Sequence, residues 1–464
     1  MSRTKQLLKN TGILVVAKIS TQVVNFLLLP LYTALLSTAQ YGEIDIYTSL
    51  AMIIIPFLTL QVEMGIFRYF ISCRDDKTRQ QTISTGFAIV GAVLLLATMA
   101  YFLVSIWFPF RYSSLLYFFY LSQSMSVVLL QVCRSMGDNF AYGLSSFIAS
   151  SLAVVLNILF IAVLHMGVEG ILYAAIIAQV VSAIYMLRRT RVLSFCRWEA
   201  VDKSVCRNLL SYSVPLVFNQ ISSWAINYSD RLIILHFWGI AQNGIYAIAN
   251  KFSNVTMTFF GMYNLAWTES VVRCIREADS VDYINRLFEL TFKVYLILII
   301  GIINLLPFVF PYMVDGEYQS AYYHVPILLT AMFFSGMAAT IGSIYLAYNK
   351  TKNVSITTTL AGICNVIIHY SLLGFCGLYA ASISTLVAFG LLFIYRFIFV
   401  RRFMPLMCRP IRLLPQLLVL CIAWLAYVEV NYLLIFLGLL LNLYFVYRLL
   451  VEHGSSLKSM LHRR

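Results

Sequence analysis

Residues 82–107, TISTGFAIVGAVLLLATMAYFLVSIW, contain no charged side chain, and this stretch decides the kind of protein to which it belongs. A helix needs about 20 predominantly apolar residues to cross the hydrocarbon core of a bilayer, and this segment is longer than that. It therefore predicts a transmembrane α-helix.

The rest of the chain has the same character. Of its 464 residues, 61% are hydrophobic and 11% are charged, whereas soluble domains have about 45–50% and about 25%. No stretch is left for a water-soluble domain of ordinary size, so conventional soluble catalysis is excluded. We predict an all-α integral membrane protein with about fourteen spans, at 11–36, 41–71, 82–107, 113–135, 140–165, 168–188, 208–235, 243–272, 285–309, 322–348, 353–374, 376–400, 411–429 and 431–450.

The distribution of Lys and Arg predicts the orientation. One set of span ends carries 26 of the 33 basic residues, and the opposite set carries only Arg111. Positive side chains are retained on the cytoplasmic side, so both termini of this multi-pass membrane protein are predicted to be cytoplasmic. The net charge of +14 then reflects lipid headgroups, and no nucleic-acid partner is expected.

An internal repeat divides the chain. At an offset of 202, the motif Ala39-Gln40-x-Gly42 matches Ala241-Gln242-x-Gly244, and near an offset of 206 Leu172–Ala175 matches Leu378–Ala381. Six spans per copy means that both copies enter the membrane in the same direction, as in transporters. We expect two parallel six-helix repeats around a central cavity, followed by two extra C-terminal helices.

The repeat also sets the expected domain boundaries: an N-terminal lobe at 1–190, a basic cytoplasmic linker at 191–207, a C-terminal lobe at 208–402, and the added helices with a tail at 403–464. The linker region binds anionic headgroups in the simplest interpretation. A regulatory or substrate-guiding role is the alternative.

The nine cysteines include no CxxC pair and no His/Cys cluster at metal spacing, so we expect no disulfide framework, no metal and no cofactor. The first span lacks an AxA-like cleavage signal and is expected to stay as a helix. No phosphate-binding GxxxxGK[ST] motif is present, which argues against ATP hydrolysis by the usual route.

Ionisable and polar residues inside the spans are the main functional signal, because they are tolerated mainly where they face a partner or an aqueous cavity. Lys18, Gln22 and Asn25 share one face of the first span by helical periodicity. We predict a substrate-binding cavity lined by Lys18, Gln22, Asn25, Arg68, Asn227, Arg231, Asn250, Lys251 and Lys293. Glu63 and Asp230 are the candidates for ion coupling.

Each of these charges also has a structural interpretation. Arg68, Arg231 and Arg396 lie near span ends, from which they could reach the headgroups. Asp230 and Arg231 are adjacent and point about 100° apart on a helix, so they do not form a simple face-to-face pair. Asn157, Asn365 and His369 are expected to make interhelical hydrogen bonds.

Two stretches resemble the bacterial polysaccharide-biosynthesis (O-antigen) flippases, the oligosaccharide-lipid branch of the multidrug/oligosaccharidyl-lipid/polysaccharide exporter superfamily. One includes Leu29–Ser37, Tyr41-Gly42-Glu43 and Tyr47. The other includes Ser229–Leu235, Gly244-Ile245-Tyr246 and Ala249-Asn250-Lys251. The resemblance implies two six-helix lobes around a cationic cavity that opens alternately to either side.

The resemblance also implies the substrate, an oligosaccharide repeat unit on an undecaprenyl-pyrophosphate carrier, flipped to the outer leaflet for O-antigen, capsule or teichoic acid synthesis. The surplus of cations independently suggests an anionic passenger, with Lys18 and Lys251 as the principal pyrophosphate contacts. The expected partners are the lipid-linked oligosaccharide, membrane lipids, and a polymerase with other glycan-assembly proteins.

Two other classes compete with this interpretation. A multidrug or metabolite cation-coupled antiporter of the same fold would favour acidic cavity residues, which the basic excess disfavours. A polytopic glycosyltransferase or polymerase would place catalytic groups on a sizeable outer loop, but the longest outer loop is only Phe310–Ala321. We therefore expect a transporter and not an enzyme.

Overall fold

The computed structural model describes residues 26–73, 75–107, 111–275, 277, 279–407 and 410–462, with main chain only at 351, 410–413 and 452–462. Within these residues the secondary structure is helical and includes no strand, which confirms the all-α prediction. The chain forms two compact units, Met1–Gly244 and Ile245–Arg464.

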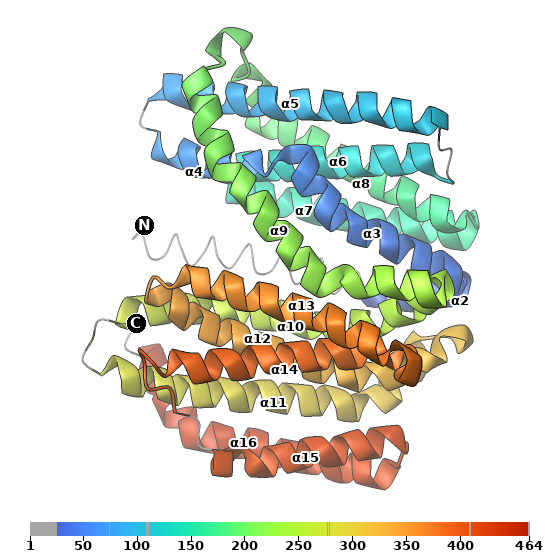
Figure 1. The fold of residues 1–464 in the computed structure, drawn as a ribbon, viewed down its shortest axis with the longest axis vertical. Helices are drawn as coiled ribbons and strands as arrows, with labels where there is room; N and C mark the ends of the chain where they lie inside the picture. The colour runs from blue at the N-terminus through green and yellow to red at the C-terminus, as the bar shows by residue number, and fades with distance from the viewer. Residues whose placement is uncertain are drawn as a thin grey trace. The chain divides into compact units, whose positions relative to one another are not determined.

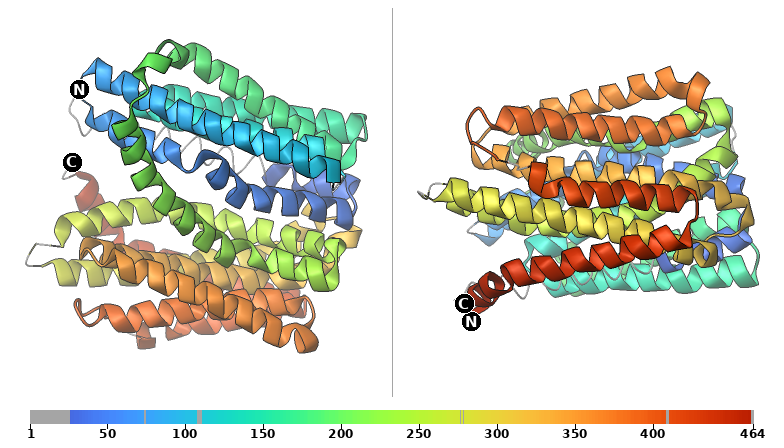
Figure 2. Two further views of the ribbon diagram at one scale, coloured as in Figure 1. Left: turned by 45° about the horizontal axis from the view of Figure 1, so that its top comes forward. Right: turned by 90° about the horizontal axis from the view of Figure 1, so that it is seen from below.

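Unit 1 is a bundle in which one long helix crosses several others. Figure 1 shows α9 running obliquely over α3, α4 and α5, which it contacts, and Figure 2 shows the same crossing from another side. The elements of this unit are α2 (Leu29–Leu35), α3 (Thr38–Thr59), α4 (Val62–Ser72), α5 (Asp76–Trp107), α6 (Ser113–Ser135), α7 (Asn139–Asn157), the π-helix η1 (Ile158–Val163), α8 (Gly167–Thr190), η2 (Val192–Ser194), η3 (Trp198–Ala200) and α9 (Lys203–Trp238).

The second predicted span is broken into α3 and α4. Leu60 and Gln61 both adopt the left-handed conformation, with φ of 48° and 55°. Two such residues in succession cannot continue a right-handed helix. Pro56 lies one turn earlier and cannot donate a main-chain hydrogen bond, which weakens the helix at the same place.

The linker after α8 is fastened to α5. The Ser84 hydroxyl donates to the Phe195 carbonyl over 2.9 Å, and the main-chain N–H of Asp202 donates to Thr85 Oγ1 over 3.1 Å. Asp202 also caps α9. The Ser204 hydroxyl and the N–H groups of Val205 and Ser204 donate to its carboxylate, and these hydrogen bonds hold the pKa of Asp202 below its usual range.

The helix α10 (Ile240–Cys274) begins in unit 1 and continues into unit 2. The other elements of unit 2 are α11 (Ser280–Met313), the 3₁₀-helix η4 (Gly316–His324), α12 (Val325–Ala347), α13 (Thr351–Cys376), α14 (Tyr379–Val400), α15 (Pro410–Val428) and α16 (Tyr432–His462).

A buried arginine joins α12, α13 and α14. Arg396 is 4% exposed and donates from Nε to Thr357 Oγ1, from Nη1 to the Ala338 carbonyl, and from Nη2 to Thr358 Oγ1. The expectation that Arg396 reaches the headgroups is therefore wrong, because these acceptors hold its guanidinium inside the bundle.

The two additional helices, α15 and α16, pack on α11 of unit 2 and form the antiparallel pair visible in Figure 2. The contact with α16 is reciprocal: Asn304 of α11 lies against Gly438, and Asn442 of α16 lies against Gly301. Small residues allow such close helix approach in membranes. The additional helices are thus an integral part of unit 2.

Ten of the described helical segments are long and apolar enough to cross a membrane. The helices α9 and α10 do not meet that criterion, although they are 36 and 35 residues long, and both carry polar side chains along their length. The chain is a multi-pass membrane protein, and the number fourteen for its spans stays a prediction.

Candidate functional site

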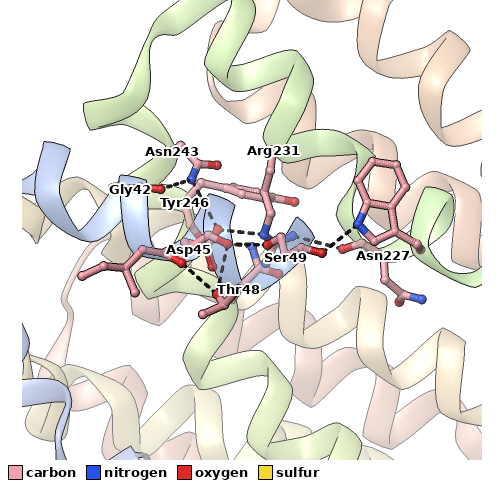
Figure 3. Close-up of polar contacts among 11 residues, drawn as sticks. Gly42, Asp45, Thr48, Ser49, Asn227, Arg231, Asn243 and Tyr246 are labelled. Carbon is pink, nitrogen blue, oxygen red and sulfur yellow. Dashed lines mark hydrogen bonds and ion pairs between the residues drawn. The ribbon is translucent and has the colours of Figure 1, made fainter. Parts of the chain in front are cut away.

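A buried ion pair stands at the centre of the polar contacts in unit 1 (Figure 3). Arg231 of α9 donates from Nε to Asp45 Oδ2 of α3 over 2.8 Å, and the two side chains are 5% and 12% exposed. A second donor, Arg231 Nη1, reaches the Asn227 carbonyl one turn back over 3.0 Å. The ring of Tyr228 lies 4.8 Å from the guanidinium carbon.

The first turn of α10 completes this network. Asn243 donates from Nδ2 to the Gly42 carbonyl over 3.1 Å and to Asp45 Oδ2 over 3.3 Å. The Asp45 carboxylate therefore receives hydrogen bonds from α9 and from the first turn of α10, and it holds both against α3.

The two glycines of the internal repeat lie next to this network. A Cβ atom on Gly42 would come within 2.0 Å of the Ile240 carbonyl oxygen, and one on Gly244 would come within 2.0 Å of the Thr38 carbonyl oxygen. The contact is reciprocal, because Gly42 corresponds to Gly244, and Thr38 to Ile240, at the repeat offset of 202. The matched motifs of the repeat thus cross each other backbone to backbone.

A pair of this kind can act as a switch. Burying two charges is costly, and their attraction offsets the cost only while the geometry is good. If α3 and α9 separated and admitted water, both charges would be solvated and the loss would be small. The Asp45–Arg231 pair can therefore stabilise one arrangement of α3 and α9 without making it permanent.

The other two predicted site residues of α9, Asn227 and Asp230, differ in their exposure. Asn227 is exposed, and its Nδ2 donates to the Ser223 carbonyl over 2.8 Å. Asp230 is buried at 2% exposure. Its neighbour Arg231 pairs with Asp45 of α3, a partner that the sequence analysis did not predict.

Glu63 is the most isolated of the predicted charges in unit 1. It follows the break between α3 and α4 and is 2% exposed, and its Oε2 has no hydrogen-bond partner among the described residues. Charging a carboxyl in such a place is costly, so a group like this commonly gains or loses a proton as its surroundings change.

Arg68 lies in the second half of α4, and its guanidinium lies over aromatic rings. Its central carbon is 4.4 Å from the Tyr212 ring centre and 6.0 Å from that of Tyr69. In the described part of the chain no carboxylate forms a salt bridge with it. Stacking on rings leaves the N–H groups in the guanidinium plane directed outward, where they can bind an anion.

In unit 2, Lys293 lies 3.3 Å from Glu289 one turn earlier, so much of its charge is balanced locally. Asn250 is buried and donates to the Tyr246 carbonyl. Lys251 is half-buried. Lys18, Gln22 and Asn25 lie outside the described residues.

Sequence reasoning missed Asp45 and Asn243. Asp45 stands between two isoleucines near the start of an apolar span, and the cost of an unpaired carboxylate there could have suggested a cationic partner. Its distance of 186 residues from Arg231 in the chain gave no local indication of which cation that was.

A family model described as polysaccharide biosynthesis protein matches residues 7–268, which is more than half of the chain. The chain belongs to the polysaccharide biosynthesis protein family. The matched region of this polysaccharide biosynthesis protein includes the Asp45–Arg231 pair, Glu63 and Arg68.

Two relatives from Haemophilus influenzae agree with this assignment. The polysaccharide biosynthesis protein is 22% identical to Lsg locus putative protein 1 over 375 residues, which cover 77% of this chain and 89% of the relative. It is 23% identical to an uncharacterized membrane protein over 268 residues, which cover 56% of this chain and 64% of the relative.

Two solved structures have the same fold as this polysaccharide biosynthesis protein. The lipid II flippase MurJ in an inward closed conformation gives a TM-score of 0.71 at 14% identity, over 95% of this chain and 99% of MurJ. An inward-facing multidrug resistance transporter of the MATE family, in the MOP superfamily, gives 0.70 at 15% identity over 84% and 98%. At these identities the likeness establishes the fold alone.

Proposed function

We propose that this polysaccharide biosynthesis protein is a flippase for undecaprenyl-pyrophosphate-linked oligosaccharide repeat units, moving them from the cytoplasmic to the outer leaflet for surface polysaccharide synthesis. The observation that carries the proposal is membership of a polysaccharide biosynthesis family combined with a fold found in a lipid II flippase. The glycan would be O-antigen, capsule or teichoic acid.

The physical problem of such a substrate fits a protein of this kind. A pyrophosphate and a row of hydroxyls cannot cross about 30 Å of hydrocarbon unaided. The isoprenoid tail can stay in the lipid throughout. A transporter therefore needs polar and cationic groups for the head and a lateral opening for the tail, and no chemical conversion of the substrate is required.

Arg68 supports the anionic part of the proposal, because its guanidinium rests on Tyr212 and its in-plane donors are suited to phosphate oxygens. We infer that Lys18 and Lys251 are the principal pyrophosphate contacts. The Asp45–Arg231 pair would stabilise one of the two states of an alternating-access cycle.

A cation-coupled antiporter of multidrugs or metabolites is the second candidate. The buried carboxyl of Glu63 favours it, since an unpaired acid within a bundle is suited to carrying a proton. The MATE-family structure has nearly the same TM-score as MurJ. In the flippase, Glu63 could serve the same purpose and couple transport to a proton gradient.

A sidedness assay tests the proposal. The full chain is purified and placed in lipid vesicles with labelled undecaprenyl-pyrophosphate oligosaccharide, and exposure of the glycan to an added glycan-cleaving enzyme is followed. We expect exposure that depends on the protein. A parallel sample without the added enzyme should return the lipid with its mass unchanged. The Lys18→Gln/Lys251→Gln double variant and Arg68→Gln should each lower the rate by about tenfold or more.

Arg189→Gln is the matched control, because Arg189 pairs with Asp138 at an exposed site and should leave the rate unchanged. Efflux of a soluble cation without any lipid exposure would favour the antiporter. A covalently altered glycan would indicate an enzyme.

A further inference from the structure

An apolar cavity that is partly open at the surface lies between α3, α5 and α6 of unit 1, close to the turn that joins α5 to α6. We propose that it binds a segment of a long isoprenoid chain, and this inference rests on the proposed function because the carrier lipid named there has such a chain. The cavity has a volume of about 340 Å³, and its lining includes Leu50, Ile54, Leu94, Ala97, Leu116 and Tyr117.

The volume is too large to be a packing defect. Voids in protein interiors are rarely larger than one water molecule, which takes up about 30 Å³ in the liquid. Ligand pockets begin at about 300 Å³. The cavity is therefore large enough for part of a chain-like ligand and too small for a whole lipid.

Three of the tyrosine hydroxyls around the cavity already have hydrogen-bond partners. The hydroxyls of Tyr117 and Thr98 lie 2.8 Å apart, that of Tyr101 donates to Ser114 over 3.2 Å, and that of Tyr120 donates to the Tyr47 carbonyl over 3.1 Å. These tyrosines present their rings and not their hydroxyls to the interior. A sugar or phosphate would find few partners there, whereas a hydrocarbon chain loses nothing on entry.

One wall of the cavity borders the lipid. The same part of α5 that contributes Leu94 and Ala97 exposes Leu95 at 63%, Leu96 at 65% and Met99 at 56%. The helix is a candidate membrane span in which few side chains are buried within the protein. A chain dissolved in the bilayer can therefore reach the cavity without passing through water.

An isoprenoid fits this lining better than a straight saturated chain. Its methyl branches and double bonds make it wider and stiffer than an acyl chain. The cavity is lined partly by aromatic rings, whose faces favour contact with polarised C–H groups. The lining residues Ile54 and Leu58 lie on either side of Pro56 in the last turns of α3. The charge bias predicts that this end faces outward, so the site would hold the tail while the head crosses.

Photolabelling tests the site. Undecaprenyl phosphate with a diazirine in its chain is added to the purified full chain in vesicles of phosphatidylethanolamine and phosphatidylglycerol, and labelled peptides are mapped by mass spectrometry. We expect labels in 47–58, 94–101 or 113–121. Ala97→Trp should fill the cavity and lower this labelling about tenfold.

Ala100→Trp is the matched control, because Ala100 lies one turn along α5 on its exposed face. It should label as the wild type does. Unlabelled undecaprenyl phosphate should compete for the lining residues. A phosphatidylglycerol with a diazirine in its acyl chain should label the lipid-exposed Leu95, Leu96 and Met99 but not the lining residues. If Ala97→Trp does not fold, Ala97→Leu gives a milder filling of the same space.

Equal labelling of the lining residues by the acyl probe, or labelling that Ala97→Trp and Ala97→Leu leave unchanged, would overturn the inference. The readout is independent of transport. Vesicles that flip the lipid-linked oligosaccharide without labels in these peptides would contradict the cavity site alone. Specific labels without flipping would contradict the proposed function alone.

Discussion

Arg231 is kept out of water by its contact with a carboxylate that lies in a different helix. Removing one member of a buried pair leaves the other charge uncompensated, at a cost of about 3–5 kcal/mol, whereas replacing both with apolar residues can be neutral. We therefore expect Arg231→Met and Asp45→Leu each to lower the melting temperature in detergent strongly. The double variant should recover most of the loss.

The comparison is a double-mutant cycle measured by intrinsic fluorescence. Arg273→Met provides a control, because its pairing with Glu269 is exposed and should contribute at most about 1 kcal/mol. Additive losses in the double variant would show that Asp45 and Arg231 do not act as a pair.

Gly42 and Gly244 are single residues at which there is no room for a side chain. A methyl group on either would collide with a carbonyl oxygen 2.0 Å away. We expect Gly42→Ala or Gly244→Ala to destabilise the protein by about 1–3 kcal/mol, or more where the main chain must move.

Gly91 in α5 serves as the reference, since a Cβ there would meet nothing within 4 Å. Ala is the better helix former by about 1 kcal/mol, so Gly91→Ala should raise the melting temperature slightly. The same chemical change thus has opposite signs at the two kinds of position. Tolerance of alanine at both Gly42 and Gly244 would argue against the backbone crossing.

At the scale of elements, Asp202 determines where α9 begins. Its carboxylate accepts hydrogen bonds from the first turn of the helix, and its pKa lies below the usual range. The stabilisation is therefore complete above the unfolded-state pKa of about 4 and is lost as the pH falls through the lower folded-state value.

We expect Asp202→Ala to lower the melting temperature at pH 7, and Asp202→Asn, which keeps one acceptor oxygen, to lower it less. The difference between wild type and Asp202→Asn should shrink when the pH is lowered below about 4. Thermal melts across that range would measure it, and a difference that grew at low pH would contradict the assignment.

The break between α3 and α4 shows how an element can depart from its hydropathy. Apolar residues continue through Leu60, so the sequence predicts one span at 41–71. The backbone conformation of Leu60 and Gln61 divides it, and this places Glu63 at the start of a new helix. Glu63, whose Oε2 has no hydrogen-bond partner among the described residues, therefore lies where the helix is least regular.

At the scale of the whole molecule, the charge bias predicts the orientation. In a cysteine-free background, Trp198→Cys in the basic linker should be protected from a membrane-impermeant maleimide in intact cells, and Tyr312→Cys at the end of α11 should react. Both side chains are well exposed, at 85% and 86%. In permeabilised cells the maleimide should label both variants. If only Trp198→Cys reacted in intact cells, the topology would be the inverse of the predicted one.

The sequence by itself determined that this is an all-α membrane protein with an internal repeat and that it belongs with the polysaccharide-biosynthesis proteins. Hydropathy, Lys and Arg bias and repeated motifs are properties of short stretches, so they can be read without knowing which helices touch. The sequence also identified Arg231, Glu63 and Arg68 as unusual, because a charge in an apolar span is costly wherever the span lies.

Only the tertiary structure decided what those charges do. It paired Arg231 with Asp45 across 186 residues, surrounded Arg396 with carbonyl and hydroxyl acceptors, left Glu63 Oε2 without a partner among the described residues, and opened an apolar cavity between α3, α5 and α6. Each of these depends on which faces of distant helices meet. That choice is made by packing over the whole chain, and no local pattern contains it.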